Sequence, residues 1–125
     1  MSLRSPLSRV RGLGSAGHGV DHWWAQRMTA LALIPLGLWL MGSLVSQVGA
    51  DHAAFKDWLG TPGRSVAMIL FLFAAFYHMK LGIQVIIEDY VQSHWHLVLQ
   101  ILNTFVCFLL GTASIFSVLK LALGG

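Results

Sequence analysis

The chain has 125 residues, of which 56% are hydrophobic and only 10% are charged, and its mean hydropathy is +0.69. Soluble domains carry roughly 25% charged residues, so this composition excludes an ordinary soluble protein and indicates a membrane protein. The net charge of +3 raises the question of nucleic-acid binding. The basic residues lead directly into an apolar segment and show no base-reading pattern, so we expect no nucleic-acid partner.

The first 27 residues differ from the rest in composition. Residues 1–20 are rich in Gly, Ser and Arg and predict an extended, weakly ordered arm. Asp21 is a candidate N-cap for a helix that begins with HWWAQR, and Trp23 and Trp24 are typical of the bilayer interface. The arginines of this region are Arg4, Arg9, Arg11 and Arg27. By the positive-inside rule they predict a cytoplasmic N-terminus.

Three segments are long and apolar enough to span a bilayer, which takes about 20 residues. They cover residues 28–48, 66–87 and 97–123. Residues 28–125 therefore form one transmembrane domain, preceded by a cytoplasmic and interfacial segment, 1–27. The predicted fold is an all-α membrane protein with three transmembrane helices and a short N-terminal cytoplasmic arm.

The loop between the first two spans and the third span contain residues that predict further structural features. Trp58, with Phe55, predicts a short amphipathic helix on the outer surface between the first two spans. Gln100 and Asn103 are expected to hydrogen-bond across helices. The small residues Gly111, Ala113 and Ser114 are expected to permit close helix packing. Because the third span has no further polar stripe, a transporter or channel is disfavoured.

The second span holds an imidazole near its middle. Ionisable groups within a membrane are rare and tend to be functional, and a neutral imidazole is a natural axial ligand for haem iron. Gly82 lies four residues after His78 on the same helix face, which leaves bare backbone for a flat ligand. A single histidine supplies only one axial position, so another chain would supply the second. Alternatively, His78 only hydrogen-bonds a neighbouring helix.

Asp89 and Tyr90 lie just after the second span, and Tyr90 is about 18 Å along the helix from His78 if the helix continues. A tyrosine hydroxyl could donate a hydrogen bond to a quinone carbonyl, although tyrosines are also common at membrane interfaces. Asp89 could orient Tyr90, assist proton delivery or cap the next helix.

Two cationic side chains, Arg27 and Lys80, each have more than one possible role. Arg27 is a candidate clamp for haem carboxylates, or it sets topology and binds lipid phosphate. Lys80 lies about 200° around the helix from His78. It is expected to meet an acid of a partner subunit or a haem carboxylate, or to extend towards the interface.

The motif H-x3-G-x6-DY, at His78, Gly82, Asp89 and Tyr90, resembles the small membrane-anchor subunit of succinate dehydrogenase, usually called the D subunit. The entry HWWAQRMTALAL is similar to that of the alphaproteobacterial members, and the resemblance covers nearly the whole chain. It implies a subunit of respiratory complex II in a bacterial inner membrane. The implied partners are a flavoprotein that oxidises succinate, an iron–sulfur subunit and a second anchor (cytochrome b) subunit.

The resemblance also implies roles for individual residues. His78 would be an axial ligand of a b-type haem, with the other ligand from the partner anchor, and Arg27 would lie near the haem propionates. Tyr90 would hydrogen-bond the quinone, expected to be ubiquinone, with Asp89 beside it. This chain would not itself oxidise succinate. The alternative is a haem-free structural anchor or an assembly partner of another respiratory complex.

Overall fold

The regular elements of the chain are all helical. The computed structural model describes residues 5–12 and 17–124, and in these residues it contains five α-helices and no strand. They are α1 (Pro6–Val10), α2 (Gly17–Ser46), α3 (His52–Leu59), α4 (Pro62–Tyr90) and α5 (Trp95–Ala122). The predicted all-α class is confirmed.

Three of these helices, α2, α4 and α5, are long and apolar enough to cross a membrane. Each is longer than the corresponding predicted span and begins before it, because the prediction counted only the apolar run, although α2 and α5 end one or two residues before the predicted ends. At 1.5 Å per residue, a helix of 29 residues is about 43 Å long, against a hydrocarbon core of about 30 Å. Helical hydrogen bonding therefore includes the polar and aromatic residues that precede each apolar run.

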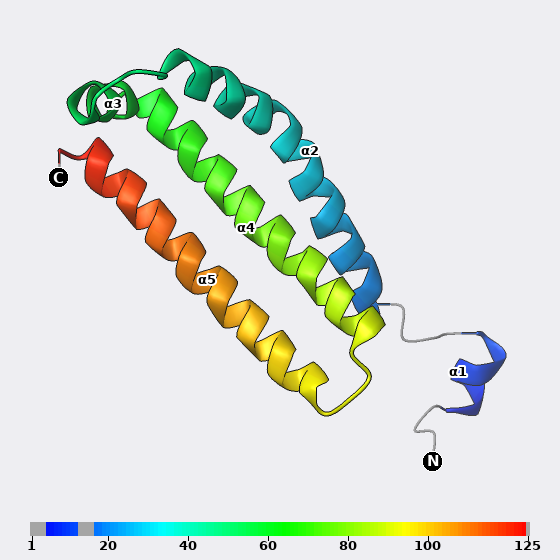
Figure 1. Cartoon of the computed structure of the whole chain (residues 1–125). Helices are drawn as coiled ribbons and strands as arrows, with labels where there is room; N and C mark the ends of the chain where they lie inside the picture. The colour runs from blue at the N-terminus through cyan, green and yellow to red at the C-terminus, as the bar shows by residue number, and fades with distance from the viewer. Residues whose placement is uncertain (1–4, 13–16, 125) are drawn as a thin grey trace.

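The three long helices lie in a row (Figure 1), with α4 in the middle. Among the described residues, α4 contacts both α2 and α5, whereas α2 and α5 do not contact each other. Here "three-helix row" denotes this arrangement, and its N-terminal end is where α2 begins, α4 ends and α5 begins. Most side chains of the row are exposed, because a single layer of helices has no enclosed core.

The start of the chain differs from the sequence-based expectation. The predicted extended arm contains the short helix α1, while residues 1–4 and 13–16 of that arm lie outside the described residues. Asp21 lies inside α2 rather than before it, so the predicted N-cap is wrong. The helix runs without interruption through residues 27 and 28, and it also continues through Pro35.

Side-chain amides of α5 bind the backbone of α4. The Asn103 Nδ2 group donates to the carbonyl oxygen of Lys80 at 3.0 Å, and the Gln100 Nε2 group donates to that of Gln84 at 3.1 Å. Asn103 is buried, with 8% of its surface exposed. The predicted interhelical hydrogen bonds of Gln100 and Asn103 are confirmed.

The same two helices come closest at a glycine. A Cβ atom added at Gly111 of α5 would lie 3.3 Å from both Cβ and Cγ of Phe76 in α4. That separation is shorter than ordinary van der Waals contact, so the absence of a side chain permits the observed packing. The expectation that a small residue allows close approach here is confirmed.

The predicted amphipathic helix between the first two spans is present as α3. The Asp51 carboxylate caps it by accepting a hydrogen bond from the backbone N–H of Ala54 at 2.8 Å. Trp58 stacks on Trp39 of α2, with ring centroids 6.2 Å apart. Leu59 is the most deeply buried large side chain of the described residues, with 2% exposed. These contacts hold α3 against the end of the row opposite its N-terminal end.

Candidate functional site

His78 lies near the middle of α4, 16 residues after its start and 12 before its end. Its ring is half-buried and reaches towards α2. There the Nδ1 atom lies 3.0 Å from the hydroxyl oxygen of Thr29. Among the described residues the other ring nitrogen, Nε2, has no hydrogen-bond partner. The imidazole therefore joins two helices through one nitrogen and leaves the second available.

Gly82, one turn after His78, faces the same neighbouring helix. A Cβ atom added there would lie 3.7 Å from the amide nitrogen of Gln26 in α2, which is ordinary van der Waals contact. On this side the bare backbone of Gly82 therefore meets the Gln26 side chain. Whether Gly82 also contacts a cofactor stays a prediction.

Three polar residues of α2 follow one another at helical spacing: His22, Gln26 and Thr29. This set is called the α2 polar stripe below. Residues four and three apart share a helix face, and Gln26 and Thr29 both lie against α4. His22 Nε2 and Gln26 Oε1 are buried and lack a hydrogen-bond partner in the described part of the chain. The sequence-based analysis missed this stripe, although its spacing was a usable signal.

Asp89 and Tyr90 are the last two residues of α4, at the N-terminal end of the row. Both are exposed, Tyr90 to 83%. Neither side chain makes a hydrogen bond within the described residues, and the structure does not bring either into contact with His78. Tyr90 is thus available to a group outside this chain.

Arg27 lies two residues before Thr29, which is about 3 Å along α2 and about 200° around it. It is exposed, and its guanidinium carbon lies 5.5 Å from the centre of the Trp23 ring. Arg27 is therefore close to the level of His78 in the row but does not face α4. The guanidinium group of Arg27 therefore faces away from α4, towards the surroundings of the chain.

Lys80 is held by a chain of hydrogen bonds along α4. Its ammonium donates to Gln84 Oε1 at 3.3 Å, and Gln84 Nε2 donates to Glu88 Oε1 at 2.9 Å. The chain runs away from mid-helix towards the end that carries Tyr90. This geometry agrees with the expectation that the Lys80 stem extends towards the interface. An acid from a partner subunit stays a prediction.

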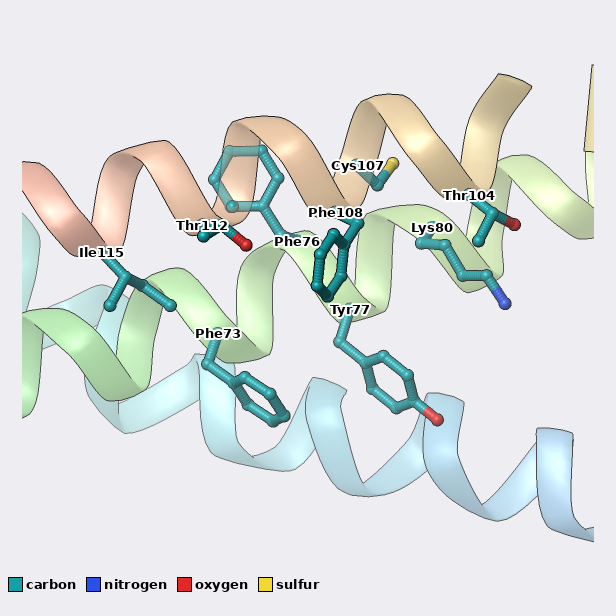
Figure 2. A pocket seen from close by; sticks show the side chains of 10 residues that line it. Phe73, Phe76, Tyr77, Lys80, Thr104, Cys107, Phe108, Thr112 and Ile115 are labelled. Atoms are coloured by element: carbon teal, nitrogen blue, oxygen red, sulfur yellow. The ribbon is translucent and has the colours of Figure 1, made fainter. Parts of the chain in front are cut away.

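A groove of about 400 Å³ lies between α4 and α5. Figure 2 shows its mainly apolar and aromatic lining, which includes Phe73, Tyr77 and Phe108, with Lys80 at one end. None of the predicted site residues His78, Asp89 and Tyr90 lines it. The groove is therefore separate from the candidate site.

The described residues contain no cluster of three or more His, Cys, Asp or Glu side chains that could hold a metal ion. His78 therefore does not share a cluster of three such side chains with other described residues. One neutral imidazole with an available nitrogen does fit one axial position of a haem.

These features define a class: a small multi-pass membrane protein with a histidine inside one span and a tyrosine at that span's end. A model of the family of succinate dehydrogenase/fumarate reductase transmembrane subunits matches residues 1–118, and the chain belongs to this family. This confirms the resemblance found in the sequence.

Individual relatives agree with the family match. The chain is 30% identical over 92 residues to the succinate dehydrogenase hydrophobic membrane anchor subunit of Rickettsia bellii, which covers 74% of each chain. It is 25% identical over 124 residues to the protein of the same description from Paracoccus denitrificans, covering 99% of this chain and 96% of that one. No solved structure matches the chain significantly.

Proposed function

We propose that this chain is a membrane-anchor subunit of succinate dehydrogenase, that it holds a b-type haem together with a second anchor (cytochrome b) subunit, and that it contributes to the site of ubiquinone reduction. One observation carries the haem proposal. His78 lies in the middle of a membrane-spanning helix, with one ring nitrogen bound to Thr29 and the other without a partner among the described residues. Family membership supports the wider assignment.

The residues present fit a haem shared between two chains. His78 would supply one axial nitrogen, and the partner anchor would supply the other. A bound haem supplies one-electron redox chemistry within the membrane, at a potential set by its ligands and burial. Arg27, exposed near the level of His78, could bind the propionates through its bidentate guanidinium. Gly82 would let the flat ring approach the backbone.

Tyr90 is proposed to bind the quinone. Its exposed hydroxyl would donate a hydrogen bond to one carbonyl oxygen of ubiquinone and stabilise the negative charge that develops there during reduction. Two electrons from the iron–sulfur subunit and two protons convert the quinone to the quinol. Asp89, adjacent in the chain, would orient Tyr90 or deliver protons. Succinate oxidation itself belongs to the flavoprotein.

The proposed location is the bacterial inner membrane, with lipid around the row. The N-terminus would be cytoplasmic and the C-terminus periplasmic. Arg9, Arg11 and Arg27 precede or open the first span and support this orientation. It would place Tyr90 on the side of the soluble subunits that deliver electrons.

One observation favours a second candidate, a structural anchor without haem. The bond between His78 and Thr29 joins α4 to α2 within this chain, so the histidine already has a structural contact. In that case His78 would stabilise the row and need no iron.

A His78→Ala variant of the affinity-tagged chain, purified from membranes, separates the two candidates. We expect the wild type to co-purify with flavoprotein, iron–sulfur and second anchor subunits, identified by mass spectrometry, and to show a b-type band in its reduced-minus-oxidised spectrum. The variant should lose the band at equal subunit recovery. His52→Ala, an exposed histidine of α3, is the matched control and should keep it. A wild-type complex without the band, or a His78→Ala complex that retains it, would contradict the haem proposal.

A further inference from the structure

The Thr29 hydroxyl makes three close polar contacts at once. Its oxygen lies 2.8 Å from the carbonyl oxygen of Ala25, 3.0 Å from that of Gln26 and 3.0 Å from His78 Nδ1. The first two contacts lie within α2, and the third crosses to α4. Thr29 is half-buried, so these contacts largely define the surroundings of its hydroxyl.

A count of protons assigns a direction to each contact. A hydroxyl has one proton and two lone pairs, and a carbonyl oxygen can only accept. The contacts to Ala25 and Gln26 therefore use the hydroxyl proton, as is usual for a threonine within a helix. The hydroxyl oxygen is then left to accept, so the proton between Thr29 and His78 belongs to Nδ1.

This direction fixes the tautomer of the histidine. A neutral imidazole that carries its proton on Nδ1 has a bare lone pair on Nε2, the nitrogen without a partner among the described residues. Histidines that bind metals commonly donate their other ring N–H to a nearby acceptor, which fixes the ring orientation and raises ligand basicity. With the opposite arrangement, Nε2 would carry the proton and could not bind iron.

We infer that Thr29 is a positioning residue that holds His78 in the Nδ1-protonated tautomer and presents Nε2 as the axial ligand. This inference rests on the proposed haem function. Thr29 touches neither haem nor iron in this arrangement and acts only through His78. Its hydroxyl, rather than its size, is the required feature.

The test compares Thr29→Val, which keeps the shape and removes the hydroxyl, with Thr29→Ser, which keeps the hydroxyl. Both variants are purified as tagged complexes. Loss of a hydrogen-bond partner of a metal ligand typically weakens metal affinity 10- to 100-fold. We therefore expect Thr29→Val to release haem to excess apomyoglobin at least about tenfold faster and to shift the largest g value of the ferric haem. Thr29→Ser should match the wild type in both measurements.

Thr104→Val is the matched control. The Thr104 hydroxyl also donates to a carbonyl in its own helix, that of Gln100 at 2.9 Å, but it contacts no imidazole. This variant should behave as the wild type. If Thr29→Val does not assemble, Thr29→Cys provides a weaker hydrogen-bonding group and should shift the same two measurements in the same direction.

The outcomes separate the inference from the proposed function. A wild-type complex without haem, or a His78→Ala complex that keeps it, contradicts the proposed function itself. Haem that depends on His78 but is released at the wild-type rate from Thr29→Val, or from Thr29→Cys where Val does not assemble, overturns the inference and leaves the proposed function standing. An equal change in Thr29→Ser and Thr29→Val also overturns it, because the hydroxyl would then not be the cause.

Discussion

Tyr90 lies at a helix end and is strongly exposed. It ends α4, where the backbone leaves the helix through Val91, and its side chain is 83% exposed. A phenol in this place has its apolar ring at the membrane boundary and its hydroxyl free for a ligand or a neighbouring subunit. The neighbouring Asp89 is also exposed.

We predict that Tyr90→Phe lowers electron transfer from succinate to ubiquinone at least about tenfold, because one hydrogen bond to the developing negative charge is lost. Succinate oxidation measured with an artificial soluble acceptor should remain unchanged, since that route avoids the quinone. The other tyrosine of the chain supplies the control. Tyr77→Phe, in the groove between α4 and α5, should leave both activities intact. Equal quinone reduction by Tyr90→Phe and wild type would rule out this role.

The sequence reveals some of these residues and conceals others for a physical reason. The polar residues in or beside the second apolar run are His78, Asp89 and Tyr90. Because polar side chains are energetically costly within a membrane, their presence there identifies them as candidate functional residues. Thr29 and Gln26 of α2 contact His78 and Gly82 of α4. These contacts depend on how α2 is aligned along α4, and a single sequence does not show that alignment. The Gln26 amide beside Gly82 was equally invisible, because the glycine's surroundings depend on that register.

The α4–α5 pair is held by polar bonds near its turn and by close packing farther along. Asn103 donates to the Lys80 carbonyl, and its own Oδ1 accepts a weak bond from the Cys107 thiol at 3.3 Å. Gly111 then lies against Phe76, which Figure 2 shows reaching from α4 towards α5. Both features could be predicted from residue type, since amides and small residues mark membrane helix contacts.

We predict that Gly111→Leu destabilises the assembled complex, because the new side chain must displace Phe76. Overpacking of this kind typically costs about 1–3 kcal/mol. The expected readout is a thermal unfolding midpoint several degrees below that of the wild type, together with reduced recovery from membranes. Gly42→Leu in α2 is the control, since a Cβ there meets no atom within 4 Å. Equal midpoints for Gly111→Leu and Gly42→Leu would show that the close approach does not matter.

Helix ends were harder to predict than helix identity. Apolar runs located all three spans, but their ends lie in polar and aromatic sequence where hydropathy gives no signal. The clearest case is α2, which begins at Gly17, whereas its predicted span begins at residue 28. Asp21 was assigned as a cap from residue type alone, and the helix passes through it.

The three-helix row leaves most of its apolar surface uncovered. In the most apolar part of each span, none of α2, 11% of α4 and 17% of α5 is buried within the chain. The sequence could not show which face packs where, because apolar residues surround each helix. Lipid can cover such a surface, but the single candidate haem ligand in the row argues for a second subunit as well. Under the proposed haem function, the second axial ligand would come from that subunit.

We predict that the chain expressed without the second anchor subunit shows no b-type haem band and reaches lower steady-state levels in the membrane. Co-expression with that subunit should restore both, because it supplies the second axial ligand and covers exposed helix surface. Spectra and quantitative immunoblots of membranes measure the two effects. A low-spin b-type spectrum from the chain alone would show that it supplies both ligands itself.

The position of α4 has a consequence for how the chain is made. Among the described residues α2 packs along α4 but not against α5, and it meets the short helix α3 through the stack of Trp39 on Trp58. The first span therefore leaves the ribosome and enters the bilayer before the long helix against which it packs exists. During that interval it depends on lipid or on another protein. Once α4 emerges, α5 follows after a connection of only residues 91–94, so this hairpin can close quickly. Translation that stops before residue 62 would leave the first span without α4, the long helix against which it packs.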